Sequence, residues 1–124
     1  MNLVQEYLQL VTDVTRFREF VHDTASAEIH NGKVKRMRTI AITIENSFPE
    51  LKNNFCEMLS LDNEEICLWV AHDILEAMNC TQAHRKSALK IIRHKAKTDK
   101  SAYGFGEKVW LKDWYKSHPK DRWI

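Results

Sequence analysis

The sequence predicts an all-α protein, and three observations support that fold class. The chain has 3 glycines and 2 prolines among 124 residues. Average usage would be about 12% for the two together, so the usual residues of tight β-turns are scarce. In several segments apolar residues recur at intervals of three and four, the spacing of one helix face. No segment sustains the apolar–polar alternation typical of a half-buried strand.

The bulk composition predicts one domain over residues 1–124. With 44% hydrophobic and 29% charged residues, the chain can bury one core and is not of the disordered class. No apolar run approaches the ~18 residues of a membrane span. The N-terminus lacks the basic start of a signal peptide, so we expect a cytoplasmic protein. A net charge of +2 is too balanced to indicate a nucleic-acid partner by itself.

The N-terminal segment, residues 3–30, carries one apolar stripe at helical period. Asp13 follows Thr12 and is able to cap a new helix, so one bent helix and two helices both remain open. The sequence His30-Asn31-Gly32 predicts the end of this segment, because glycine is common where a helix ends in the left-handed conformation. The stripe consists of Leu3, Tyr7, Leu10, Val14, Phe17 and Val21.

The middle of the chain predicts three further helices. A stripe over residues 33–47 ends before Pro49, which is well placed as the first residue of a helix over 49–59. Asp62 or Asn63 is able to cap the next helix, over residues 63–78, which has two glutamates in its first turn. Its apolar surface is broad, and we therefore expect neighbours to bury it on more than one side.

The C-terminal third predicts two more helices, about six in all. Thr81 is a plausible cap for a helix over residues 82–97. The sequence Tyr103-Gly104-Phe105-Gly106 predicts a loop, since it holds two of the three glycines. A last helix is expected from Glu107 to about His118, ended by Pro119.

Nothing in the sequence marks catalytic chemistry, a metal site or a cofactor site. The odd cysteine count without a C-x-x-C motif argues against a disulfide framework or a zinc knuckle, so reduced thiols are expected at Cys56, Cys67 and Cys80. His72 and Glu76 are four apart on one helix but supply only two ligands, which favours a polar helix pair. Asp73 is either a buried group bonded to neighbouring backbone or a carboxylate in a cleft.

A row of basic residues is the most suggestive local pattern. The four lie on one face of the helix over residues 82–97, roughly opposite its apolar residues. The row is either a solvated surface or a docking site for an acidic protein surface or a phosphate backbone. Trp123 lies beyond Pro119. It either holds the C-terminal tail against the domain or is exposed and contacts a partner. The basic residues are Lys86, Lys90, Arg93 and Lys97.

Two motifs carry a resemblance to a known family. The sequence L-D-N-E-E-I-C-L-W-V-A over residues 61–71 resembles the opening of a HEAT-type helical repeat. The sequence G-F-G-E-K-V-W-L-K-D-W over residues 104–114 is similar to the G-F-x-A-K-x-x-L-x-E-W ending of a small bacterial family, described only as a domain of unknown function with HEAT-like α-α repeats. The resemblance covers roughly residues 15–116. The chain departs from the pattern at Cys67, where an Arg is usual, and at Glu107, which replaces a small residue.

The resemblance implies a short right-handed α-α superhelix in which residues 33–47 pair with 49–59, and 63–78 pair with 82–97. The second helix of each pair would line the concave side, which would place the basic row on the binding surface. Some proteins similar to this family are suspected immunity proteins. The resemblance therefore implies a non-enzymatic module that binds a cognate bacterial toxin through the basic row and Trp123. A HEAT-like nucleic-acid-binding protein that uses the same row, and a plain scaffold, are the alternatives.

Overall fold

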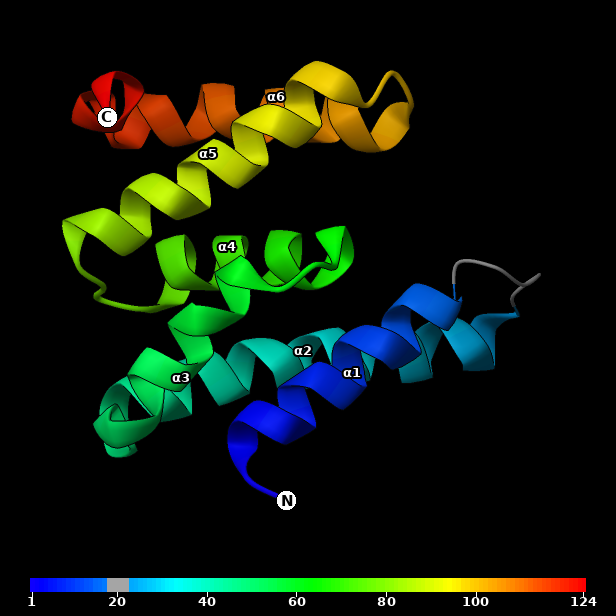
Figure 1. The fold of residues 1–124 in the computed structure, drawn as a ribbon. Coiled ribbons are helices and arrows are strands. Elements are labelled where there is room, and N and C mark those ends of the chain that lie inside the picture. Colours follow the sequence, from blue (N-terminus) through cyan, green and yellow to red (C-terminus); the bar gives the residue numbers. More distant parts are fainter. Residues whose placement is uncertain (18–22) are drawn as a thin grey trace.

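The chain folds into six α-helices and three short 3-10 helices in the computed structural model, which describes residues 1–17 and 23–124 (Figure 1). No strand occurs in that part of the chain, so the predicted all-α class is confirmed. The right-handed superhelical arrangement stays a prediction. The α-helices are α1 (Leu3–Phe17), α2 (Thr24–Ser47), α3 (Lys52–Glu57), α4 (Glu64–Ala77), α5 (Gln82–Thr98) and α6 (Ala102–Ser117). The 3-10 helices are η1 (Pro49–Leu51), η2 (Met58–Ser60) and η3 (Pro119–Trp123).

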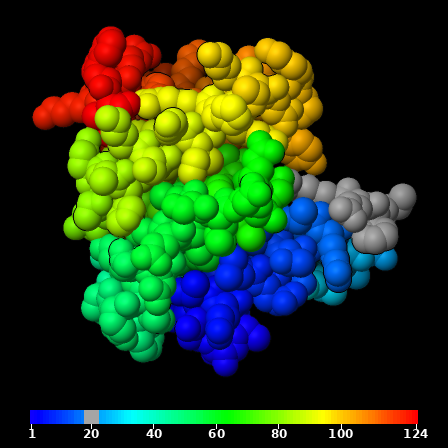
Figure 2. All heavy atoms as spheres, viewed as in Figure 1, coloured from blue at the N-terminus to red at the C-terminus, as the bar shows by residue number. Residues whose placement is uncertain are grey.

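Successive helices pack on one another along the molecule. In Figure 1, α1, α2 and α3 lie at the bottom, α4 lies in the middle, and α5 and α6 lie at the top. Helix α4 contacts α1, α2 and α5, which explains why its apolar surface is broad. The space-filling view shows the side chains of consecutive helices in contact along this stack (Figure 2).

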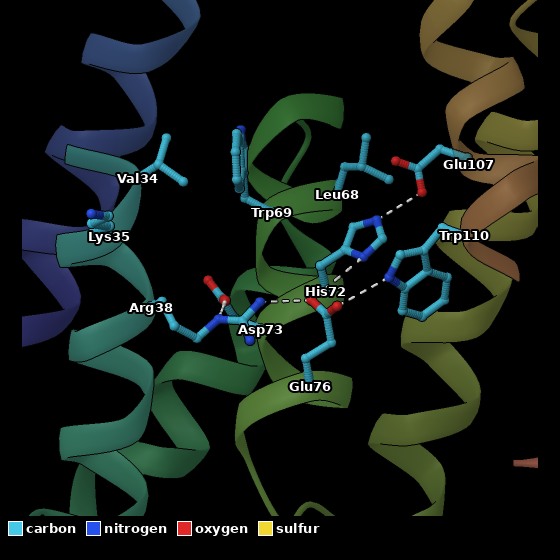
Figure 3. Close-up of a pocket in the computed structure, with 10 residues that line it drawn as sticks. All are labelled: Val34, Lys35, Arg38, Leu68, Trp69, His72, Asp73, Glu76, Glu107 and Trp110. Atoms are coloured by element: carbon cyan, nitrogen blue, oxygen red, sulfur yellow. Dashed lines mark hydrogen bonds and ion pairs between the residues drawn. The ribbon is translucent and has the colours of Figure 1, made fainter. Parts of the chain in front are cut away.

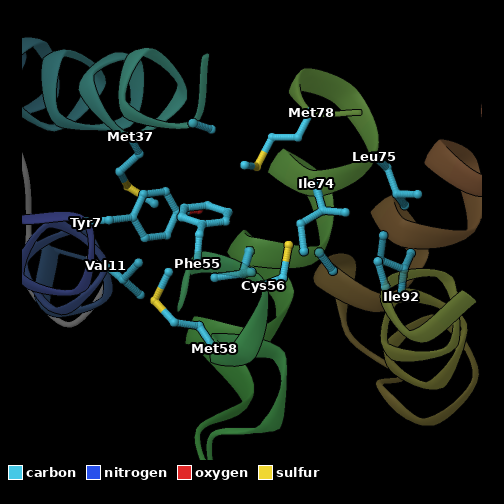
Figure 4. Close-up of a cluster of buried hydrophobic side chains, with 14 of the residues drawn as sticks. Tyr7, Val11, Met37, Phe55, Cys56, Met58, Ile74, Leu75, Met78 and Ile92 are labelled. Atoms are coloured by element: carbon cyan, nitrogen blue, oxygen red, sulfur yellow. The ribbon is translucent and has the colours of Figure 1, made fainter. Parts of the chain in front are cut away.

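One cluster of buried side chains runs from α1 to α6. Its first member is Tyr7 of α1 and its last is Leu111 of α6. Near the α1 end, the rings of Tyr7 and Phe55 meet edge to face, with centroids 4.8 Å apart (Figure 4). Full burial of one such large apolar side chain stabilises the fold by about 1.5–3 kcal/mol. Since every α-helix contributes to this cluster, no helix has a separate core.

The N-terminal segment contains two helices, and the cap that starts the second one is Asp23. Its carboxylate accepts a hydrogen bond from the backbone N–H of Ser26 at 2.7 Å. Asp13, the other candidate, lies inside α1 and binds the side chains of Gln9 and Lys33. Val21, the last residue of the predicted stripe, lies outside the described residues.

The predicted helix end at His30-Asn31-Gly32 is wrong, because these residues lie inside α2. Among the described residues no glycine has a positive φ, so Gly32 makes no left-handed turn. Side chains that follow this position hold α2 alongside α1: Lys33 pairs with Asp13 at 3.2 Å, and Arg36 pairs with Glu6 at 2.6 Å. Such interhelical contacts offset the cost of about 1 kcal/mol that a glycine adds inside a helix.

The helix starts in the middle of the chain are mostly as predicted. Asn63 caps α4 by accepting from the N–H of Ile66, and Thr81 caps α5 by accepting from the N–H of His84. Pro49 is the first residue of η1, as expected of a proline. The single helix predicted over residues 49–59 is wrong, however. That segment divides into η1, the six-residue α3 and η2.

The loop predicted over residues 103–106 is also wrong, because α6 begins there. Ser101 caps the helix by accepting from the N–H of Tyr103. A Cβ atom on Gly104 would overlap the backbone carbonyl oxygen of Asp99, whereas one on Gly106 would meet no atom within 4 Å. Gly104 therefore serves close packing between the start of α6 and the end of α5, not flexibility.

None of the helices in residues 1–17 and 23–124 combines the length and apolarity that a membrane crossing requires.

Replacing each glycine of α6 by alanine tests this close packing. We expect Gly104→Ala to lower the free energy of unfolding by about 2 kcal/mol, because the backbone at Asp99 must shift. Gly106→Ala is the matched control and should raise it by up to about 1 kcal/mol, since alanine is the better helix former. Urea unfolding followed by circular dichroism measures both, and equal changes in the two variants would contradict the packing argument.

Candidate functional site

Side chains from three helices line a groove with a volume of about 450 Å³ (Figure 3). Because these helices are far apart in the sequence, the groove exists only in the folded chain. Helix α2 contributes Val34, Lys35 and Arg38; α4 contributes Leu68, Trp69, His72, Asp73 and Glu76; and α6 contributes Glu107 and Trp110.

Helical spacing explains why these side chains share one surface. On α4, residues 69, 72, 73 and 76 follow each other at intervals of three, one and three, which places them on one side of the helix. The other side of α4 carries Val70, Ile74 and Leu75 into the core. On α6, Glu107 and Trp110 are three apart and face α4 in the same way (Figure 3).

The floor of the groove holds a buried carboxylate with two side-chain partners. Asp73 is 4% exposed, and Arg38 Nε donates to its Oδ1 at 2.7 Å. The hydroxyl of Tyr7, itself fully buried, donates to Oδ2 at 2.5 Å. Both partners are side chains, so the predicted bonding of Asp73 to neighbouring backbone is wrong. Asp73 is nevertheless buried, as that alternative expected, and it also lines a cleft, as the other alternative expected.

The electrostatics of this cluster follow from its burial. Burial raises the pKa of Asp73, and the hydrogen bonds from Tyr7 and Arg38 oppose that rise. Burial, together with the neighbouring carboxylate of Asp73, raises the pKa of Tyr7 well above its ordinary value. Tyr7 therefore keeps its proton and acts as a hydrogen-bond donor to Asp73.

A second set of contacts joins α4 to α2 and α6. Glu76 accepts from Arg38 Nη2 at 2.6 Å and from the indole N–H of Trp110 at 3.1 Å. His72 Nε2 lies 2.7 Å from a carboxylate oxygen of Glu107. The His72 ring also meets the Trp110 ring edge to face, with centroids 4.5 Å apart. Most polar side chains of the groove therefore hold one another in place.

The His72–Glu76 pair is a weak contact within this network. His72 Nδ1 lies 3.9 Å from the nearest Glu76 oxygen, while its closer partner is Glu107. Over residues 1–17 and 23–124, no group of three or more His, Cys, Asp or Glu residues is placed to hold a metal ion. Glu107, where the resembled family has a small residue, here connects α6 to α4.

Two groove residues remain open to a partner. Lys35 is exposed, and its amine lies within ion-pair distance of no carboxylate among the described residues. Trp69 is half-buried, and none of the described residues accepts a hydrogen bond from its indole N–H. The groove as a whole carries three carboxylates, two basic side chains and His72. It thus offers an aromatic surface of mixed charge above a rigid floor.

The structure divides the predicted basic row. Lys86, Lys90 and Lys97 are exposed on α5. Arg93 is half-buried and is occupied by the C-terminal tail: it donates to the hydroxyl of Tyr115 at 2.7 Å and to two tail carbonyls at 2.6 Å. The expected face of four free cations is therefore reduced to three lysines. Binding by these residues stays a prediction.

Trp123 is 83% exposed, and it does not hold the tail in place. Arg93 and Asp121 of η3 have that role, and Asp121 accepts from Arg85 at 2.5 Å and from the indole N–H of Trp114 at 2.8 Å. Trp123 lines a shallow hollow with residues of α6 and η3, and it is not among the groove residues. Of the predicted partner-binding residues, none lines the groove.

Sequence reasoning missed the groove because it considered each helix separately. Arg38 lies next to the apolar stripe of its helix, and Asp73 lies on an apolar helix. These two opposite charges beside apolar residues were the available signal. Comparison of the chain with protein-family models, with curated proteins and with solved structures finds no match. The resemblance to HEAT-like repeats stays a prediction from the two motifs.

Removing the arginine of the buried pair tests how strongly it supports the groove. Arg38→Met leaves Asp73 buried without a cation, which costs about 2–3 kcal/mol at pH 7 once the partial exposure of Arg38 is allowed for. Arg36→Met is the matched control on the same helix, because its pair with Glu6 is more exposed and worth about 1 kcal/mol or less. Equal losses in the two variants would contradict the buried role.

The loss of stability in Arg38→Met should depend on pH, and its direction follows from the pKa of Asp73. Without Arg38 the pKa of Asp73 in the folded state rises further above its unfolded value, so the folded state binds the proton more tightly. Stability is then lost as the pH rises from the unfolded pKa of about 4 towards the higher folded pKa. We expect the difference between Arg38→Met and wild type to be smaller at about pH 4 than at pH 7. Urea unfolding at both pH values measures it.

Proposed function

We propose that this protein is a non-enzymatic, cytoplasmic protein-binding module that acts as an immunity protein: it binds a cognate bacterial toxin and neutralises it by covering the toxin's active surface. The observation that carries the proposal is the groove across α2, α4 and α6, with its hydrogen-bonded floor and with Trp69 and Lys35, whose side-chain polar groups have no partner among residues 1–17 and 23–124. The two motifs that resemble HEAT-like repeats, among whose relatives immunity proteins are suspected, support the same function.

The groove has the chemistry of a protein-binding surface. Aromatic and arginine side chains at the centre of an interface contribute most of its binding energy, and the groove holds two tryptophans beside Arg38. Its floor is already ordered by Asp73, Glu76 and Glu107, so little side-chain freedom is lost when a partner binds. A toxin docked here meets a prearranged surface of both charges, which favours a partner with complementary charges.

Nucleic-acid binding is the second candidate, and the exposed lysines of α5 favour it. Lys86, Lys90 and Lys97 are able to contact phosphates. Each such contact makes the slope of log affinity against log salt concentration more negative by about 0.9. The groove itself is poorly suited to a phosphate backbone, because three carboxylates line it. With Arg93 bound to the tail, the α5 face also has one cation fewer than predicted.

The protein encoded by a neighbouring toxin gene is the probe for the first candidate. We expect its isolated toxic domain to form a tight 1:1 complex with this chain, measured by calorimetry and by rescue of growth. Lys35→Glu and Trp69→Ala should each weaken the complex about tenfold or more, or about 1.4 kcal/mol. Circular dichroism and thermal midpoints confirm that both variants fold.

The double variant Lys86→Glu/Lys90→Glu is the matched control, since both residues are exposed and lie outside the groove. It should leave the affinity for the toxic domain unchanged. A complex that the control weakens and the groove variants spare would move the docking surface to α5. Absence of a complex, together with salt-sensitive retention of the chain on DNA that the control abolishes, would support the second candidate instead.

A further inference from the structure

Two of the three cysteines lie in contact, away from the groove. Cys56 is in α3 and Cys80 is in the connection between α4 and α5, and their sulfur atoms are 3.6 Å apart. Cys67 has different partners: its thiol donates to the carbonyl oxygens of Leu59 and Leu61 at 3.3 and 3.1 Å. All three are free thiols. The count of three and their spacing in the sequence did not indicate this pair, because only the fold brings residues 56 and 80 together.

The pair is accessible to solvent, and Cys80 is the more exposed of the two cysteines. Cys56 is 2% exposed and belongs to the buried cluster, whereas Cys80 is only partly buried (Figure 4 shows Cys56). Both line a hollow of about 270 Å³ that also includes Lys52 and His84. A small reagent that enters this hollow therefore meets Cys80 before Cys56.

The connection that carries Cys80 is held in place by charged side chains. The backbone N–H of Asn79 donates to a carboxylate oxygen of Glu45 at 2.6 Å, and Lys52 donates to the carbonyl oxygen of Asn79. Lys52 and Glu45 also pair with each other at 2.7 Å. These contacts join α2, α3 and the connection, so the two sulfur atoms are kept together in the reduced protein.

The surroundings favour different protonation states for the two thiols. The hydrogen bond from Cys56 and the positive charge of Lys52 lower the pKa of Cys80, while partial burial and Glu45 oppose that decrease. The contact with Cys80 and burial both raise the pKa of Cys56. Together with its greater exposure and the nearby Lys52, this favours Cys80 as the nucleophile of the pair and Cys56 as the resolving thiol.

We propose that Cys80 and Cys56 form a redox-active dithiol site whose oxidant is a small hydroperoxide. Cys80 first loses its proton to solvent, and its thiolate attacks one oxygen of hydrogen peroxide. The O–O bond breaks, Cys80 becomes a sulfenic acid, and the hydroxide that leaves takes up a proton from solvent to form water. The Cys56 sulfur then attacks the Cys80 sulfur; the S–S bond forms, the S–O bond breaks, and a second water leaves with the Cys56 proton. Two thiols are oxidised as one peroxide is reduced to two waters. Two molecules of a small thiol such as glutathione then reduce the 56–80 disulfide to two thiols by exchange, and they leave joined as glutathione disulfide.

The disulfide would connect α3 to the chain between α4 and α5, 24 residues further on. Such a cross-link restricts the unfolded chain and raises the thermal midpoint, here by about 5 °C or more. The hollow shares no lining residue with the groove between α2, α4 and α6. The redox site is therefore independent of the proposed toxin binding, and each fails or succeeds by its own experiment.

The test uses the purified, reduced full chain and hydrogen peroxide. We expect an intact mass lower by about 2 Da, peptide mapping that joins residues 56 and 80, and recovery with reduced glutathione. Cys67→Ser is the matched control and should react like wild type. Cys56→Ser should stop at a sulfenic acid on Cys80 that dimedone traps, and Cys80→Ser should react at least about tenfold more slowly.

Three results would overturn the proposal. They are a peptide map of the oxidised wild-type protein without the 56–80 bond, loss of the bond in Cys67→Ser, and equal peroxide reaction rates in Cys80→Ser and wild type. The wild-type peptide map decides the matter even if Cys56→Ser fails to fold.

Discussion

The buried carboxylate of Asp73 is the interaction on which the rest of the structure depends. Its two partners, Tyr7 and Arg38, come from α1 and α2, so one charge on α4 ties together the first three long helices. A buried carboxylate without such partners would cost several kcal/mol. The position of α2 against α4 is therefore coupled to the same contacts that form the groove floor, and the shape of the groove and the stability of the fold share a cause.

The groove and the exposed face of α5 are two different kinds of surface. Across the groove, polar side chains are ordered by one another, and Trp69 and Lys35 alone among the residues discussed there lack a described polar partner. On α5 the exposed lysines are solvated, and the one arginine of the row holds the C-terminal tail. Preorganised aromatic surfaces suit a protein partner, whereas isolated lysines suit a diffuse phosphate surface. The proposed toxin-binding function follows from the first kind.

Much of the fold could be predicted from the sequence, because helix periodicity and capping are local. The caps at Asn63 and Thr81 and the start at Pro49 agree with the structure. Two of the failures share a physical origin: Gly32 and Gly104 were interpreted as breaks, although contacts with α1 and with Asp99 decide their conformations. A glycine is used either where the backbone needs an unusual conformation or where another part of the chain packs closely against it. The local sequence does not distinguish these two uses.

The sequence by itself determined the all-α class, the starts of α1, α4, α5 and η1, and the residues available for chemistry. Tertiary structure alone decided which of those residues meet. Arg93 and Lys90 look equivalent on a helical wheel, yet only Arg93 reaches the carbonyls of the tail. Cys56 and Cys80 look unrelated, yet their sulfur atoms are in contact. Periodicity assigns a side chain to a face of its own helix, but its partners depend on how helices distant in the chain pack, and that packing is set by the whole buried core.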